Sequence, residues 1–139
     1  MDMFNLKYIV LLVLMLQLTT MSSQELTEFK WKKRILLLID TKNDLHTRNL
    51  QLSKFDGHYN GIMERDLVLL VYNGKEVLDR DGMTTHINPD NVTYGEFQGI
   101  ILIGKDGGVK LRKTYIVEAN EVFDLIDQMP MRRSEMKNR

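Results

Sequence analysis

The chain has 139 residues, of which 43% are hydrophobic and 27% are charged, and its 19 basic and 19 acidic residues give a formal net charge of +0. These values are ordinary for a globular protein of one domain, and the neutral charge argues against a nucleic-acid-binding protein, which usually has a strong basic excess. The chain has no cysteine, which excludes disulfides, thiol redox chemistry and thiolate metal sites.

Residues 1–22 have the pattern of a secretory signal peptide. Lys7 supplies the positive start, residues 8–18 form an apolar core, and Thr20 and Ser22 are small residues at the positions of a cleavage site. The core, about 11 residues, is shorter than the roughly 20 that a membrane-spanning helix needs. We therefore expect an exported protein, periplasmic or secreted, with residues 23–139 as its single domain. An uncleaved N-terminal membrane anchor is the alternative.

The first half of this domain predicts a βαβ unit. Five aliphatic residues at 35–39 indicate a buried central strand, and residues 67–72 form a second apolar run of strand length. Between them, the loop Asp40–Asp44 precedes an amphipathic helix whose apolar stripe continues to Ile62 and which Gly57 weakens. Residues 73–98 contain several turn signals and predict one long irregular loop.

The second half predicts a β-hairpin followed by a helix. Residues 99–112 form an apolar strand, a turn that contains two glycines, and a half-exposed edge strand. Strand alternation places Val109 and Leu111 on one face and Lys110 and Arg112 on the other. A helix is expected over 117–128, Pro130 ends it, and a basic, solvated tail follows.

The predicted order, β-α-β and then β-β-α, is that of the thioredoxin-fold core. We expect an α/β, thioredoxin-like fold with a mixed four-stranded sheet and helices on its faces. The segments WKKRILL (31–37), ERDLV (64–68), LIGKDGGVKLR (102–112) and MPMRRSEM (129–136) resemble the P-DUDES domain. This is an uncharacterised peroxiredoxin-like domain of exported bacterial proteins and of secreted sushi-repeat and equarin-type proteins. The resemblance implies a thioredoxin-like fold, an extracytoplasmic location and no established activity.

The loop after the first strand is one candidate site. Active thioredoxin-like proteins carry their nucleophilic cysteine where this strand meets its helix, and here those positions are Thr41 to Asp44. A thiol peroxidase or disulfide reductase is therefore excluded. Thr41 remains able to bind a ligand at the helix N-terminus, although helix capping explains the same residues.

A basic face is the second candidate. The residues that would form it, if the tail folds back along the edge strand, are Lys105, Lys110, Arg112, Arg132 and Arg133, with Lys32 and Arg34 nearby. Such a face suits an acidic protein or an anionic polymer of the cell envelope or the extracellular space. In the alternative interpretation, the two tail arginines form salt bridges with nearby acidic residues, Glu118, Glu121, Asp124 or Glu135.

These patterns favour an exported, redox-inactive binding module, with no cofactor and no metal site. The three histidines, His46, His58 and His86, do not form a metal-binding pattern. One alternative is a non-thiol enzyme or a small-ligand site between the Asp40–Asp44 loop and residues 84–91. Another is a structural subunit that associates through strand 109–114.

Overall fold

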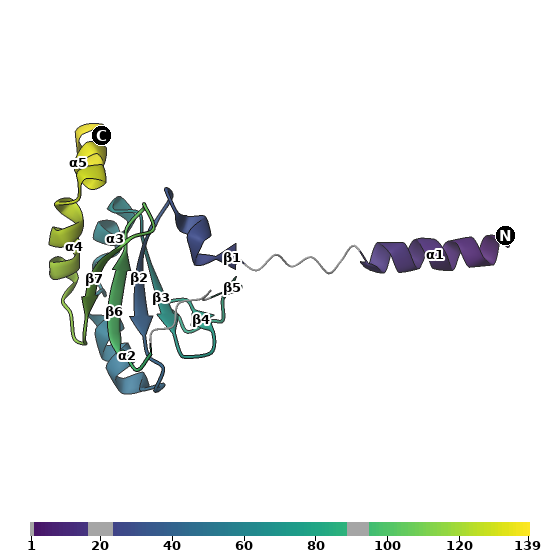
Figure 1. Ribbon diagram of the computed structural model, residues 1–139, viewed down its shortest axis with the longest axis horizontal. Coiled ribbons are helices and arrows are strands. Elements are labelled where there is room, and N and C mark those ends of the chain that lie inside the picture. The colour runs from purple at the N-terminus through teal and green to yellow at the C-terminus, as the bar shows by residue number, and fades with distance from the viewer. Residues whose placement is uncertain (1, 17–23, 89–94) are drawn as a thin grey trace.

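The computed structural model describes residues 2–16, 24–88 and 95–139. Its main feature is a mixed five-stranded sheet in the order β4-β3-β2-β6-β7 (Figure 1). The strands are β2 (Arg34–Ile39), β3 (Leu67–Tyr72), β4 (Val77–Leu78), β6 (Gly99–Ile103) and β7 (Val109–Lys113). The helices are α1 (Met3–Leu16), α2 (Leu45–Ser53), α3 (Tyr59–Glu64), α4 (Ala119–Asp127) and α5 (Pro130–Lys137).

The predicted central strand is confirmed. All six residues of β2 are buried, and the strand pairs in parallel with β3 and antiparallel with β6. Leu36 and Leu38 face the cluster that includes Val122 and Phe123 of α4, whereas Ile35 and Leu37 face a second cluster on the other side of the sheet. After Arg34, the remaining five residues of the strand are all apolar, as expected for a strand that protein covers on both faces.

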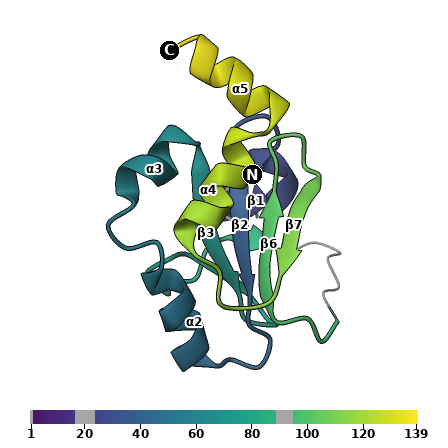
Figure 2. The same cartoon turned by 90° about the vertical axis from the view of Figure 1, so that its left-hand side faces the viewer.

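The two faces of the sheet have different covers. Helices α2, α3 and α4 lie on one face, with α4 across the middle of the sheet (Figure 2). The other face carries the short 3-10 helix η2 (Leu26–Phe29) and a small parallel sheet of β1 (Gln24–Glu25) and β5 (Ile87–Asn88).

The helix that follows β2 breaks at the predicted weak point. Helix α2 ends at Ser53 and α3 begins at Tyr59. Gly57 lies between them with φ of 76°, a left-handed conformation that suits glycine and ends a right-handed helix. The apolar stripe nevertheless serves one core, because Phe55 and Ile62 belong to the same buried cluster.

The expectation of a four-stranded sheet and an irregular 73–98 loop needs correction. Asn73 and Gly74 form a tight turn in which Asn73 N donates to Glu76 O at 3.2 Å, and the chain returns as β4, antiparallel to β3. Strands β4 and β5 have two residues each. Such strands are too short to show an alternating pattern, so the sequence did not reveal them. Residues 89–94 of this segment lie outside the described residues.

The β6–β7 hairpin is confirmed, and β7 is an edge strand. In its turn, Gly107 has φ of 81°, and Gly104 N donates to Gly108 O at 2.9 Å. Leu102 lies opposite Leu111, but the next residue, Ile103, lies opposite Val109. Strand β7 therefore contains a β-bulge, in which Lys110 is the extra residue.

The bulge overturns the predicted alternation of β7. Leu111 packs against the α4 side of the sheet, and Lys110 is on that side too, lining a cavity with Met129. Arg112 instead stacks on Phe97, which packs against the opposite cluster. Lys110 and Arg112 thus point to opposite faces, because one inserted residue shifts the alternation by one position.

The C-terminal segment differs from the predicted solvated tail. Pro130 ends the preceding helix, as predicted, but it is also the first residue of α5, a position that tolerates a missing N–H. Arg132 of this helix is buried, with an exposed fraction of 1%. The tail is therefore part of the packed domain.

At the other end of the chain, α1 occupies most of the predicted signal segment. This helix stands apart from the sheet (Figure 1). Among the described residues, no helix is long and apolar enough to cross a membrane. The predicted cleavage-site residues, Thr20 and Ser22, lie outside the described residues.

Candidate functional site

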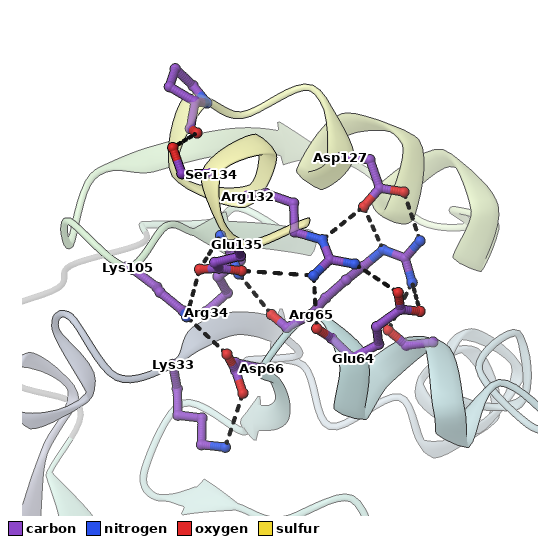
Figure 3. A network of polar contacts seen from close by, with 12 residues as sticks. Lys33, Arg34, Glu64, Arg65, Asp66, Lys105, Asp127, Arg132, Ser134 and Glu135 are labelled. Atoms are coloured by element: carbon purple, nitrogen blue, oxygen red, sulfur yellow. Dashed lines mark hydrogen bonds and ion pairs between the residues drawn. The ribbon is translucent and has the colours of Figure 1, made fainter. Parts of the chain in front are cut away.

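Two buried arginines are the centre of a charged network at one end of the sheet (Figure 3). Arg34, the first residue of β2, donates to both carboxylate oxygens of Glu135 at 3.2 Å and to the backbone oxygen of Arg65 at 2.9 Å. Glu135 of α5 also accepts from Lys105 at 2.7 Å. One carboxylate therefore joins β2, the hairpin turn and α5.

Arg132 forms the second half of the network. Its guanidinium donates to Asp127 at 3.1 Å, to the Glu64 carboxylate at 3.1 Å and to the Glu64 backbone oxygen at 2.9 Å. Arg65 binds the other oxygen of Asp127 at 2.7 Å. These contacts fasten α4 and α5 to the end of α3, and planar guanidinium groups suit this multiple bonding.

The network lowers the pKa values of its carboxyl groups. Burial opposes the ionisation of Glu135, but the hydrogen bonds from Lys105 and Arg34 outweigh it, so the pKa of Glu135 lies below its ordinary value of 4.5. Asp66 and Asp127 follow the same pattern, and the pKa of each lies below the ordinary value of 3.8. All three groups are therefore ionised at neutral pH, and their charges stabilise the fold.

The structure places two of the predicted binding residues inside this network. Arg132 is buried, and Lys105 forms ion pairs with Asp66 at 2.8 Å and with Glu135 at 2.7 Å. The salt-bridge interpretation describes Arg132, with Asp127 and Glu64 as its main partners. Arg132 and Lys105 thus hold the domain together and present little charge to a partner.

The other predicted cations are on the surface, in separate places. Lys110 pairs with Asp106 of the hairpin turn at 2.8 Å, and the Arg112 guanidinium lies 4.2 Å from the centre of the Phe97 ring. Arg133 is exposed on α5, and among the described residues its side chain forms no hydrogen bond or ion pair. Strand β7 thus carries three cations in five residues, of which the third, Lys113, is paired with Glu121.

The Thr41 loop caps a helix. Asp40 accepts a hydrogen bond from Asp44 N at 2.8 Å and one from Arg48 Nε at 2.8 Å. Asp44 in turn accepts from Thr47 N at 3.2 Å, at the first turn of α2. The Thr41 hydroxyl accepts from the Gln98 amide. Asp40 and Asp44 thus bond to each other's segment and to the first turns of α2, as the capping interpretation requires, whereas Thr41 bonds to Gln98 outside the loop.

Sequence reasoning named Glu135 among the possible partners of the tail arginines, and Arg132 does pair with it at 3.8 Å, but it missed Glu64 and Asp127 and gave Arg34 a minor role. An arginine that directly precedes five aliphatic residues of a buried strand is the signal that was present, because such a residue begins the strand and needs a partner for its charge. That partner, Glu135, is 101 residues further along the chain. No local pattern connects the two.

Comparisons with known proteins identify a family. The sequence profile of a family described as Domain of unknown function (DUF4174) matches residues 25–135. Coiled-coil domain-containing protein 80 of Danio rerio is 28% identical over 136 aligned residues, which cover 80% of this chain. The chain spans 15% of the length of that relative. No solved structure matches the chain at a significant level.

Proposed function

This chain belongs to the DUF4174 family, and from that premise we propose that it is an exported, redox-inactive binding module with a thioredoxin-like fold. The element order β2-α2-α3-β3 and then β6-β7-α4 supports the fold. The pattern of residues 1–22 supports export. The motifs of the hairpin and the C-terminal segment support the resemblance to the P-DUDES domain.

The proposed partner is an acidic polypeptide segment that adds to the sheet as an extended strand beside β7. The observation that carries this proposal is that β7 ends the sheet and that three of its five residues are cationic. No described strand pairs with its outer edge. Backbone groups of such an edge supply binding energy to an extended peptide, and the side chains supply selectivity. Lys110, Arg112 and Lys113 favour acidic side chains.

Another role for the same charges is protection of the edge against aggregation. The two roles differ in what a charge reversal does. If the cations recognise a partner, their reversal to Glu removes binding, and the protein stays monomeric because the edge remains charged. If they only protect the edge, no acidic peptide binds the original protein either.

The test uses the full chain and an eight-residue peptide in which Glu and Val alternate, with a Lys-Val peptide as its counterpart. The double variant Arg112→Glu, Lys113→Glu is compared with the control Lys42→Glu, Lys75→Glu, which changes the net charge equally through exposed loop residues. We expect the Glu-Val peptide to bind the original protein. Its affinity for the Arg112→Glu, Lys113→Glu variant should be about tenfold lower, and its affinity for the control variant should be unchanged. Equal loss in both variants, or equal binding of both peptides, would overturn the proposal.

A further inference from the structure

A cavity of about 330 Å³ lies between the turn of the β6–β7 hairpin and the junction of α4 and α5. Its volume is in the range of sites that hold small molecules. Its charged lining consists of three cationic residues, Arg34, Lys105 and Lys110, and one acidic residue, Asp106, and the α4–α5 junction contributes Met129, Pro130 and Met131. We propose that this cavity binds a small organic carboxylate with an unbranched apolar chain.

Arg34 supplies the first argument. Its exposed fraction is 1%, and its two terminal nitrogens bind Glu135 and the Arg65 backbone oxygen. Its Nε is buried and has no hydrogen-bond partner among the described residues. A buried donor without an acceptor is uncommon in proteins, because burial removes its bonds to water. Arg34 lines the cavity, so a carboxylate bound there places a second negative charge beside a buried guanidinium that is not fully satisfied.

Lys110 supplies the second argument. The β-bulge turns this residue to the cavity side of the sheet, and bulges commonly re-aim a side chain near a functional site. A Cβ on Gly104 would lie 2.7 Å from Lys110 Cε, so the lysine stem crosses the hairpin close to Gly104. Within the described part of the chain its one ion pair is with Asp106, and the two side chains have exposed fractions of 34% and 41%. Exposed pairs are weak, so a ligand carboxylate competes with Asp106 for this ammonium group.

The apolar wall of the cavity determines which apolar group the ligand should carry beside its carboxylate. Methionine side chains are unbranched and adjust to the shape of an apolar group, and Met129 and Met131 flank the rigid ring of Pro130. An inorganic anion uses the cationic side of the cavity alone. A carboxylate with a chain of several methylene groups uses both sides, so affinity is expected to rise with chain length.

The test is a titration of the full chain, labelled with ¹³C at the methionine methyl groups, with acetate, butyrate and hexanoate. Hexanamide and inorganic phosphate are the matched probes that lack the charge or the apolar chain. We expect hexanoate to shift the signals of Met129 and Met131 and the Arg34 Nε–H signal, while Met63 and Met83 stay unchanged. Hexanoate should bind about tenfold tighter than hexanamide, because charge-assisted hydrogen bonds are lost in the amide.

Two variants test whether hexanoate binding depends on the cavity residues. Lys110→Gln should weaken hexanoate binding about fivefold or more, and Lys113→Gln, on the same strand but outside the cavity, should leave it unchanged. Lys110 belongs to both the cavity and the proposed peptide edge, but the Arg112→Glu, Lys113→Glu variant should bind hexanoate normally, so this variant separates a failure of the peptide site from a failure of the cavity. The proposal is wrong if hexanoate at millimolar concentration shifts neither methionine, if hexanamide binds equally well, or if Lys110→Gln has no effect.

Discussion

Replacing Glu135 by Gln should destabilise the domain far more than the same replacement in an exposed ion pair. Glu135 accepts two hydrogen bonds from Arg34 at 3.2 Å and one from Lys105 at 2.7 Å. Glutamine keeps the shape but removes the charge, which leaves the buried Arg34 guanidinium without its carboxylate. Breaking a buried pair costs about 3–5 kcal/mol. The Glu135 side chain is 21% exposed, so water offsets part of this, and we expect a loss of about 2–3 kcal/mol.

Urea unfolding of the full chain, followed by far-ultraviolet circular dichroism, measures this loss. For a domain of this size it corresponds to a fall in Tm of about 10 °C. The control is Glu121→Gln, which removes a carboxylate from an ion pair with Lys113 whose side chains are 44% and 46% exposed. It should cost less than about 0.5 kcal/mol. If Glu135→Gln costs no more than this control, the network does not stabilise the fold as described.

Three further predictions concern other parts of the domain. The free energy of unfolding should fall as the pH drops below about 4.5. A carboxyl group whose pKa is lowered in the folded state stabilises the fold above its unfolded pKa, and this stabilisation is lost when the group is protonated. Acid titration of Glu135→Gln should therefore show a weaker dependence of stability on pH. Gln51→Leu should cost about 2–4 kcal/mol in urea unfolding, because the buried Gln51 amide binds both Val117 N, at 2.7 Å, and Val117 O, at 2.8 Å; a loss below about 1 kcal/mol would contradict this. Gly99→Ala should lower soluble yield and Tm sharply, because a Cβ there would lie 2.2 Å from the backbone oxygen of Lys113, and an unchanged Tm would show that the two strands separate easily.

The sequence predicted the structure correctly where neighbouring residues in the chain determine it. The aliphatic residues of β2 indicated a strand covered on both faces, and the glycines after Ile103 indicated the hairpin turn. The Lys110 bulge was not predictable, because whether a strand carries one extra residue depends on its partner strand. The burial of Arg132 was not predictable either, because basic residues are normally exposed and its partner Glu64 is 68 residues away.

The candidate binding surface was likewise predicted in part from the sequence. Sequence indicated a basic edge strand, and the structure leaves Lys110, Arg112 and Lys113 at the sheet edge. The sequence offered internal ion pairs of Arg132 only as an alternative and did not indicate those of Lys105, because the main acidic partners of both residues come from other elements. A cation's availability depends on the carboxylates that the fold brings to it.

Amide hydrogen exchange of the full chain with and without the Glu-Val peptide tests the central claim most directly. Addition of a strand beside β7 should protect those amides of residues 109–113 that do not bond to β6, and Arg112→Glu, Lys113→Glu should abolish the added protection. Peptide binding without a change in exchange at residues 109–113 would show that the partner binds elsewhere and would contradict the assignment of β7 as the binding edge.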